Sequence, residues 1–322
     1  MSLANPPMTL QVTRIVAQAK DVLSLELSDP CGDELPPFTP GAHLELQLHN
    51  GLIRHYSLLN DSSERHRYVV AVGLSADSRG GSRYIHGSLR QGDSLRVVGP
   101  RNNFPLDESA ERFCFVAGGI GITPILSMIR WCVRHGKDWR LVYAARNRSR
   151  AAFYEELQAL DAERVHYHFS DERNGEHLAV EELIASLREG EQLYCCGPDA
   201  LMQAVKQVSG VVTERVHFEW FAAPEQPADE SVSGADFDLV LRRSGRTLRV
   251  AEGQSILEVL EAAGLDVPFS CRSGICRSCE TGICAGTADH RDLVLSEEER
   301  ASNTSMLICV SRALSSSLEL DL

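Results

Sequence analysis

The spacing of the cysteines near the end of the chain constrains this sequence more than any other feature. Of the ten cysteines in 322 residues, Cys271, Cys276 and Cys279 lie on one short loop, and Cys309 follows far downstream. A C-x4-C-x2-C loop with a distant fourth cysteine is the plant-type [2Fe–2S] pattern, whereas structural zinc prefers two close pairs of ligands. The spacing predicts an iron–sulfur cluster, with zinc or unrelated thiols as alternatives. We expect Cys284, in a strand-like segment, to be a spare core thiol.

Charge and the start of the chain limit the compartment and the partners. Residues 1–7 contain neither a basic nor an apolar segment, so we expect no secretory signal and a cytoplasmic protein with reduced thiols. No apolar stretch approaches the ~20 residues of a membrane span. The formal net charge is −13 without a basic run, which argues against nucleic acid and membrane surfaces as partners.

Hydropathy and composition divide the chain into three domains and a linker. Residues 1–105 contain several short period-2 runs, which favour an antiparallel β-barrel. In residues 106–223, apolar runs alternate with helical stretches, as in a parallel α/β sheet. Residues 224–235 have linker composition, and residues 236–322 form a small α+β domain around the cysteine loop. The expected fold class is therefore multidomain, with β-barrel, α/β and iron–sulfur domains.

Two glycine-rich turns of the α/β domain are suited to a nucleotide. Gly119 and Gly121 lie between the first predicted strand and a helix, where backbone amides and the helix N-terminus can meet a pyrophosphate. An ordinary tight turn is the alternative. Cys196 ends a later strand at the carboxyl edge of the sheet, where ligands bind in such folds. The standard dinucleotide fingerprint is absent, because Pro124 replaces its last glycine and Asn147 stands where an acid is usual.

Two barrel segments carry residues suited to a phosphate and a flat ring. Arg54 and Tyr56 share one predicted strand, and Ser82 closes an Arg-Gly-Gly-Ser turn. An arginine, glycine amides and a serine hydroxyl can hold a phosphate, and a tyrosine can lie against a ring. Each segment alone is equally compatible with an exposed strand or turn.

Together and in this order, the motifs resemble the phthalate dioxygenase reductase and vanillate demethylase reductase family, within the ferredoxin–NADP reductase superfamily. The resemblance covers essentially the whole chain. It runs from Arg-x-Tyr-Ser-Leu and Arg-Gly-Gly-Ser through Gly-Gly-Ile-Gly-Ile-Thr-Pro, Cys-Cys-Gly-Pro and Val-His-Phe-Glu to Ala-Asp-His-Arg-Asp and the cysteine loop. It implies FMN in the barrel, a nicotinamide dinucleotide on the α/β domain and a [2Fe–2S] cluster in a β-grasp-like ferredoxin domain.

By matching position, the resemblance also implies roles for residues of the barrel. Arg54 and Ser82 would hold the FMN phosphate, Tyr56 would pack on the isoalloxazine and Ser57 would lie near its N5. The other flavin-site residues implied are His55, Ala71, Val72, Gly80 and Gly81.

The same matching places the nicotinamide. Cys196 would stand near its reactive carbon and Phe218 on the other side of the flavin, so the implied catalytic residues are Ser57, Cys196 and Phe218. The further nucleotide-site residues implied are Gly119, Gly121, Thr123, Arg146, Gly197 and Pro198. The resemblance favours NADH, and NADPH is the alternative because arginines flank Asn147. The implied cluster ligands are Cys271, Cys276, Cys279 and Cys309.

The implied function is that of an NADH-dependent oxidoreductase, the reductase component of a two-component Rieske-type oxygenase, either a dioxygenase or a demethylase or other monooxygenase. NADH gives up two electrons as one hydride and a cluster accepts one at a time, so a flavin must convert between them. The alternatives are a reductase for another acceptor, such as a cytochrome P450, and a non-catalytic redox-sensing module. Residues 236–322 hold 14 acidic and 9 basic residues, so we expect docking to a basic partner surface to weaken with salt.

Overall fold

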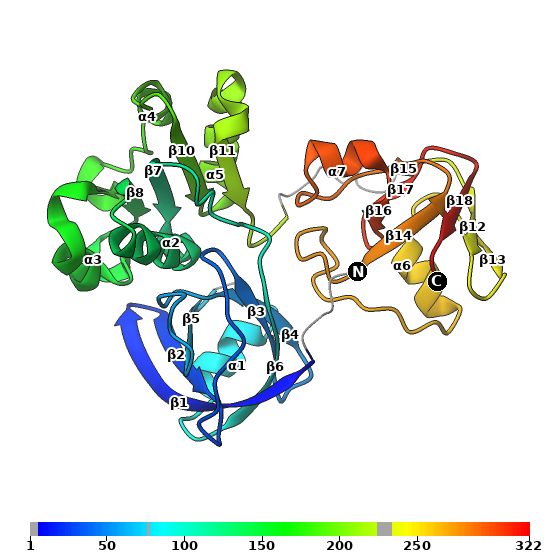
Figure 1. The fold of residues 1–322 in the computed structure, drawn as a ribbon, viewed down its shortest axis with the longest axis horizontal. Coiled ribbons are helices and arrows are strands. Elements are labelled where there is room, and N and C mark those ends of the chain that lie inside the picture. The colour runs from blue at the N-terminus through cyan, green and yellow to red at the C-terminus, as the bar shows by residue number, and fades with distance from the viewer. Residues whose placement is uncertain (1–5, 76–77, 224–233) are drawn as a thin grey trace. The chain divides into compact units, whose positions relative to one another are not determined.

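The computed structural model describes residues 6–75, 78–223 and 234–322. The chain divides into two compact units, Met1–Phe221 and Ala222–Leu322 (Figure 1). Most of the linker predicted at 224–235 lies outside the described residues, and the predicted domain boundaries stay predictions. Among the described residues, no helix is long and apolar enough to cross a lipid bilayer.

The first part of unit one is an antiparallel six-stranded sheet in the order β4-β3-β6-β1-β2-β5. Its elements are β1 (Met8–Ala19), β2 (Val22–Ser28), β3 (His43–Gln47), β4 (Ile53–Ser57), β5 (Tyr68–Gly73), α1 (Gly81–Gly87) and β6 (Ser94–Arg101). Alternate apolar residues of the strands fill its core. Two register shifts interrupt the pairing of the long β1 with β2.

The second part of unit one is a parallel five-stranded sheet in the order β11-β10-β7-β8-β9. Its strands are β7 (Arg112–Gly118), β8 (Asp138–Ala145), β9 (Val165–Phe169), β10 (Glu191–Cys196) and β11 (Val216–Glu219). Its α-helices are α2 (Ile122–Arg134), α3 (Tyr154–Asp161), α4 (Val180–Ala185) and α5 (Asp199–Val208). Short 3-10 turns join them: η1 (Gly119–Gly121), η2 (Arg148–Arg150), η3 (Ala162–Arg164), η4 (Ser170–Arg173), η5 (Ser209–Val211) and η6 (Thr213–Arg215).

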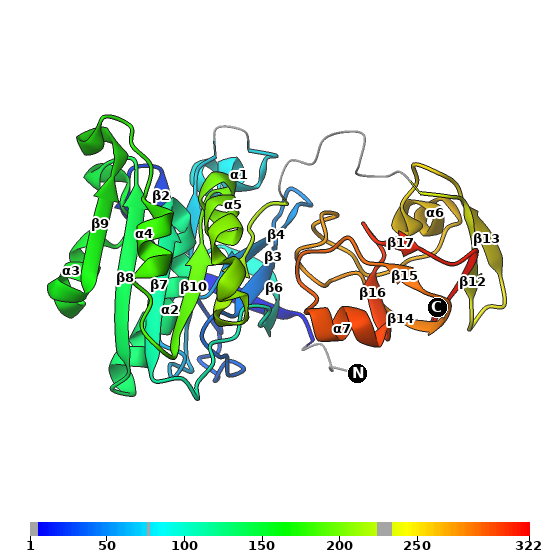
Figure 2. The ribbon, with the colours of Figure 1, turned by 90° about the horizontal axis from the view of Figure 1, so that it is seen from above.

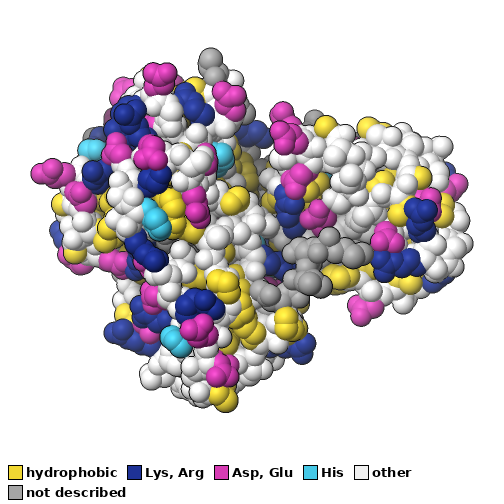
Figure 3. Space-filling view, in the orientation of Figure 1, with side chains coloured by type: hydrophobic (Ala, Val, Ile, Leu, Met, Phe, Trp, Pro, Cys, Tyr) yellow, Lys and Arg dark blue, Asp and Glu magenta, His cyan; other side chains and the backbone are white. Residues whose placement is uncertain are grey.

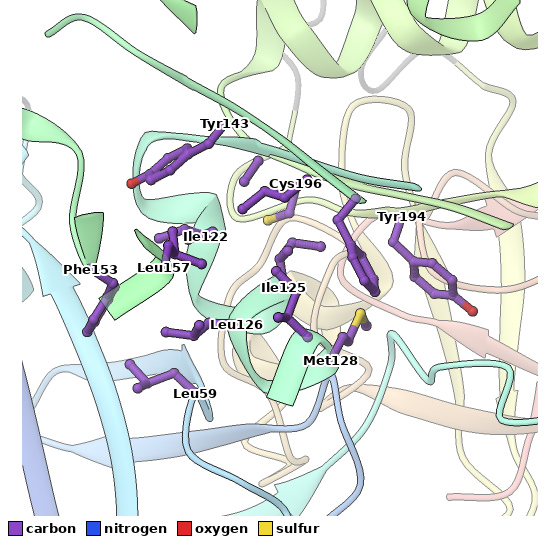
Figure 4. Close-up of a cluster of buried hydrophobic side chains, with 14 of the residues drawn as sticks. Leu59, Ile122, Ile125, Leu126, Met128, Tyr143, Phe153, Leu157, Tyr194 and Cys196 are labelled. Atoms are coloured by element: carbon purple, nitrogen blue, oxygen red, sulfur yellow. The ribbon is translucent and has the colours of Figure 1, made fainter. Parts of the chain in front are cut away.

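Helix α2 joins the two parts of unit one. It is buried on nearly all sides, because one face packs on the parallel sheet and another on the barrel. Figure 4 shows Leu59 of the barrel beside the α2 side chains. The buried Gly41 N–H donates to Ser127 Oγ at 3.2 Å, and the Arg130 guanidinium donates to the Leu59 carbonyl. The helix that begins at the glycine turn therefore also fixes the barrel.

Unit two contains a mixed five-stranded sheet in the order β13-β12-β18-β14-β16 and a small β15–β17 pair. The elements are β12 (Phe237–Leu241), β13 (Thr247–Val250), α6 (Ile256–Ala262), β14 (Glu280–Ala285), β15 (Ala288–Asp289), α7 (Glu297–Ser302), β16 (Ser305–Leu307), β17 (Arg312–Ala313) and β18 (Ser317–Leu320). Strand β12 runs antiparallel to β13 and parallel to β18, and α6 lies beside them (Figure 2). This is the predicted β-grasp-like ferredoxin fold, so the predicted fold class is confirmed.

Candidate functional site

The predicted flavin residues lie along the two edge strands of the barrel sheet. Strands β4 and β5 stand at the two ends of the sheet order, and edge strands are places where a ligand can approach the backbone. The strands approach each other at an isolated bridge between Leu58 and Val70. Ala71 and Val72 follow on β5, both buried. The structure thus brings these residues to the open seam of the barrel near Tyr56.

A phosphate-sized set of groups gathers at the start of α1. The Arg54 side chain lies directly on Gly81, since a Cβ there would be 2.6 Å from Arg54 Nε. Gly80 has φ +92°, which favours glycine. The hydroxyl of Ser82 donates to Ser78 Oγ at 2.9 Å. The guanidinium, the hydroxyl and a turn without side chains fit the predicted FMN phosphate.

Alternation along β4 separates the predicted residues into two sets. Tyr56 faces the barrel core with Arg54, and burial raises the pKa of its phenol to about 12. His55 lies on the opposite face. There its ring contacts that of His43 at 5.3 Å, and its Nε2 is 3.9 Å from a Glu45 carboxylate oxygen. The structure therefore does not bring His55 to the phosphate turn.

The two glycine turns of the parallel sheet pack on each other. A Cβ at Gly121 would lie 2.1 Å from the Cys196 carbonyl oxygen, so only glycine fits there. The same contact involves the small residues Gly118, Gly197 and Pro198. Gly119 instead has φ +53° and no atom within 4 Å of a Cβ position. The amides near Gly119 therefore open to a space that a pyrophosphate can enter.

Two predicted residues lie away from that space. Thr123 is buried, and its hydroxyl donates to the Ile120 carbonyl at 3.0 Å. Phe218 pairs in register with Cys195, which places it on the opposite face of the sheet from Cys196. Its ring lies 6.2 Å from that of Trp220.

Three side chains from both parts of unit one meet at the carboxyl edge of the parallel sheet. Ser57 Oγ donates to Glu219 Oε2 at 3.5 Å, and Glu219 is the register partner of Cys196. Burial raises the pKa of the Glu219 carboxyl to about 8. Burial, and next the Glu219 carboxylate, raise the pKa of the Cys196 thiol well above its ordinary value. The Cys196 thiol is therefore protonated at neutral pH, whereas the Glu219 carboxyl titrates near neutral pH.

Glu219 was missed by the sequence analysis. Its signal was indirect: it ends the last strand of the domain, and that strand pairs in parallel with the strand that ends at Cys196. Only the assumption of that pairing would have placed the carboxyl beside the thiol and Ser57.

A second missed residue lies where the adenosine ribose is expected. The sequence shows Asn147 instead of an acid after the second strand of the sheet. The structure supplies an acid from η4, the turn that follows the neighbouring strand β9, because Asn147 Nδ2 donates to Asp171 Oδ2 at 2.8 Å. The Asp171 N–H also donates to the Arg146 carbonyl at 2.9 Å. A carboxylate here can accept from a ribose 2′-hydroxyl and repels a 2′-phosphate.

In unit two, the cysteine loop folds onto the segment that carries Cys309. The Cys309 thiol lies close enough to the thiols of Cys271 and Cys279 for both to influence its pKa, which is raised to about 12. Cys276 is buried on the same loop. Cys309 thus lies beside the loop cysteines, although β14, β15 and β16 separate it from them in the sequence. Cys284 is partly exposed on β14, so the prediction of a core thiol is wrong.

The loop shape also fits a [2Fe–2S] cluster. Gly274 has φ +68°, and a Cβ there would lie 2.8 Å from Val310 Cγ2, so only glycine lets the loop approach this closely. Among the described residues, no three His, Cys, Asp or Glu side chains are placed to hold a single metal ion. Each iron of a [2Fe–2S] cluster takes only two of the four thiolates, so such a cluster needs no three-ligand group.

Comparison with known proteins identifies the domains. Residues 239–314 match the 2Fe-2S iron–sulfur cluster binding domain, and residues 115–207 match the oxidoreductase NAD-binding domain. The chain is 46% identical over 317 residues to phenoxybenzoate dioxygenase subunit beta of Ectopseudomonas oleovorans, with 98% of both chains covered.

Two solved structures extend the comparison. One is phthalate dioxygenase reductase, described as a modular structure for electron transfer from pyridine nucleotides to [2Fe–2S]; it is 41% identical, with TM-score 0.72 and 99% and 98% of the chains covered. The other is an intact type IV self-sufficient cytochrome P450 monooxygenase, 38% identical with TM-score 0.91, where the match covers 98% of this chain but only 41% of that one. The predicted cofactors, FMN, NADH and a [2Fe–2S] cluster, are those of the phthalate dioxygenase reductase family. At this identity and coverage, the chain belongs to the phthalate dioxygenase reductase family of oxidoreductases.

Proposed function

We propose that this chain is the reductase component of a two-component Rieske-type oxygenase and passes electrons from NADH to that oxygenase. The observation that carries the proposal is the meeting of Ser57, Glu219 and Cys196 at one sheet edge, in a chain that ends in a [2Fe–2S] domain. The names of its relatives, phenoxybenzoate dioxygenase subunit beta and phthalate dioxygenase reductase, support an oxygenase as the acceptor. Ten free cysteines suit a reducing compartment, which we propose is the cytoplasm.

The barrel residues bind and orient the flavin. Arg54 and Ser82 hold the phosphate, since a guanidinium can make two parallel bonds to it. Tyr56 provides a flat surface for the ring, and Ser57 lies at the end of the same strand. When bound, FMN supplies the conversion between the hydride of NADH and the one-electron steps of the cluster. The four thiolates of Cys271, Cys276, Cys279 and Cys309 would hold that cluster.

Glu219 accepts and releases the proton that remains after the electron transfer. A hydride carries one proton with its two electrons, and the cluster takes only electrons. One proton must therefore leave the site for each NADH. Glu219 Oε2 accepts the hydrogen bond of Ser57, and its pKa of about 8 lies near neutral pH, where a carboxyl can both take and release a proton. The neutral Cys196 thiol would lie beside the nicotinamide without adding charge.

Asp171 supports NADH over NADPH as the donor. Its carboxylate lies beside Asn147 at the sheet edge where the adenosine ribose is expected. A ribose hydroxyl donates to such a carboxylate, whereas a 2′-phosphate is repelled.

A cytochrome P450 is the second candidate for the acceptor. The match of 98% of this chain to part of a self-sufficient P450 monooxygenase favours it, since that protein joins a similar reductase to a P450. Reconstitution separates the two candidates. A Rieske-type oxygenase that turns over with this reductase at least as fast as with its own supports the main proposal. Turnover with a P450 alone supports the second.

The visible spectrum of the full-length protein tests the electron path. The protein, supplied with FMN, iron and sulfide, is treated anaerobically with NADH or with NADPH. We expect prompt bleaching of the flavin and iron–sulfur bands with NADH and slow bleaching with NADPH. Bleaching by NADPH alone would contradict NADH as the electron donor. A protein that binds no flavin and contains zinc would contradict the proposed function as a reductase.

A further inference from the structure

The cysteine loop contains residues whose backbone conformation their side chains disfavour. Arg277 directly follows Cys276 and has φ +58°, in the left-handed region. Residues with a Cβ atom rarely adopt this region, which glycine occupies freely. Arg272 directly follows Cys271 and has φ +55°. Both left-handed turns thus follow a predicted cluster ligand within the sequence Cys-Arg-Ser.

The first turn shows what this conformation does. The Ser273 N–H points back at the preceding cysteine and donates to Cys271 Sγ at 3.3 Å. Hydrogen bonds to cluster sulfur are among the features that set the reduction potential of a cluster. The second turn has the same residue order and nearly the same φ, so the backbone after Cys276 turns in the same direction.

The second turn is held by helix α7. The Nη1 and Nη2 groups of Arg277 donate to both carboxylate oxygens of Glu299, at 2.8 and 2.6 Å, and Nη2 also donates to the Val294 carbonyl at 2.7 Å. Glu299 is itself fixed by the capping box at the start of α7. Arg272 is held differently, because its guanidinium donates to Glu261 and lies over the Phe269 ring, and its side chain is 47% exposed, against 25% for Arg277.

We propose that Arg277 is a positioning residue for the [2Fe–2S] cluster, and that its ion pair with Glu299 holds the left-handed turn after Cys276. A second contact ties the same loop to the segment before α7, since the Leu293 N–H donates to the Gly274 carbonyl at 3.0 Å. Without the ion pair, the strained turn can relax and move the sulfur of Cys276 with it. The inference rests on the proposed cluster ligands and adds a residue beyond them.

The test uses the full-length protein loaded with FMN and cluster. Glu299→Gln removes the charge but keeps the capping box, because glutamine also serves at that position. We expect the half-life of the cluster's visible absorption in EDTA to fall roughly three- to tenfold. We also expect a more negative midpoint potential in an EPR-monitored titration, because a relaxed turn loses hydrogen bonds to sulfur. Glu298→Gln is the matched control: it changes a neighbouring exposed carboxylate on α7 and should leave both readouts unchanged.

Two further variants separate positioning from general stability. Glycine adopts the left-handed turn unaided, so Arg277→Gly added to Glu299→Gln should return the half-life toward that of the wild type. Arg277→Lys keeps the charge but loses the forked contact and should give an intermediate half-life. A double variant as labile as Glu299→Gln, or a Glu299→Gln variant identical to the wild type, would overturn the inference. A wild-type protein that takes up no cluster would instead overturn the proposed ligands.

Discussion

The loop of proposed cluster ligands and the proposed hydride site are built in opposite ways. Three of the four predicted cluster ligands lie between residues 271 and 279, and local turns bring them together. The hydride site takes Ser57, Cys196 and Glu219 from three strands of two sheets, with 162 positions between the hydrogen-bonded Ser57 and Glu219. The first site depends on the path of one loop, and the second depends on how strands and α2 align the barrel with the parallel sheet. Changes should therefore damage the two sites independently.

The largest expected effect is loss of the distant cluster ligand. Cys309→Ser removes the one ligand outside the loop, so we expect no cluster absorption and no electron transfer to an oxygenase. NADH–ferricyanide activity should persist, because it draws electrons from the flavin in unit one. Cys284→Ser is the matched control, since that thiol is partly exposed on β14. A cluster EPR signal that survives Cys309→Ser, or disappears in Cys284→Ser, would contradict the ligand set.

The converse change damages unit one and spares the cluster. In Gly121→Ala, the new Cβ would lie 2.1 Å from the Cys196 carbonyl oxygen, so the two glycine turns must separate. Overpacking of this kind costs about 1–3 kcal/mol. We expect a lower unfolding temperature of unit one and a large rise in the KM for NADH, with cluster absorption intact. Gly210→Ala, where no atom lies within 4 Å of the new Cβ, should change neither. Unaltered NADH kinetics in Gly121→Ala would contradict the inference that this contact between the glycine turns shapes the nucleotide site.

The contrast also explains what could be predicted from the sequence. The cysteine spacing alone predicted the type of cluster, and the alternation of strands and helices predicted the fold class. Glu219 and Asp171 escaped because each becomes relevant only through a neighbouring parallel strand, β10 for one and β8 for the other. The pairing of strands is not visible in local hydropathy. Similarly, the side of the sheet that Phe218 faces follows from its register, which no local motif encodes.

Glu219→Gln tests the hydride site without moving its backbone. We expect turnover with the oxygenase to fall roughly a hundredfold, at the lower end of general acid–base effects, while NADH still reduces the flavin. The limb of the pH profile near pH 8 should disappear. Stopped-flow spectra of the two half-reactions separate these steps. The exposed Glu214→Gln, just before the same strand, is the control; a pH limb retained in Glu219→Gln would assign the titration to another group.

The same carboxyl also affects stability. Its pKa is raised from 4.5 to about 8 in the folded protein. Between these values the folded state holds a proton that the unfolded state has lost, so the free energy of unfolding should fall as pH rises through this window. Glu219→Gln should flatten that dependence in denaturant titrations of unit one. A slope equal to that of the wild type would show that the Glu219 proton is not held in the folded state.

A smaller effect is expected at the adenosine end of the nucleotide. Asp171→Asn replaces the charged acceptor proposed for the ribose hydroxyl by a neutral amide, and a hydrogen bond to a charged group contributes about 1.5–3 kcal/mol. We expect kcat/KM for NADH to fall roughly tenfold and the preference over NADPH to narrow by a similar factor. Glu172→Gln, at the next position, controls for loss of charge alone. Preference unchanged in Asp171→Asn would mean that selectivity lies elsewhere.

The smallest expected effect concerns the surface of unit two. Figure 3 shows acidic side chains at α7, where Glu297 and Glu298 are exposed and Glu299 is engaged by Arg277. Exposed acids at the edge of an interface raise the association rate with a basic partner at low salt and have little effect on the affinity. We expect the combined change of Glu297 and Glu298 to Gln to lower the apparent rate with the oxygenase a few-fold at low ionic strength, and not at high. The control is Glu252→Gln, an exposed acid at the turn before α6.

This last variant separates docking from cluster positioning on one short helix. Glu297 and Glu298 should affect only the salt dependence of the reaction with the oxygenase, because both are exposed and neither has a hydrogen bond or ion pair to the cysteine loop in the described part of the chain. Glu299 accepts two hydrogen bonds from Arg277 of that loop, so its substitution should affect the cluster half-life at every salt concentration. If the double variant left the salt dependence unchanged, the acids of α7 would not form the docking surface. Since both effects arise within one turn of α7, their separation by ionic strength would show that a local site can be altered without touching the surface beside it.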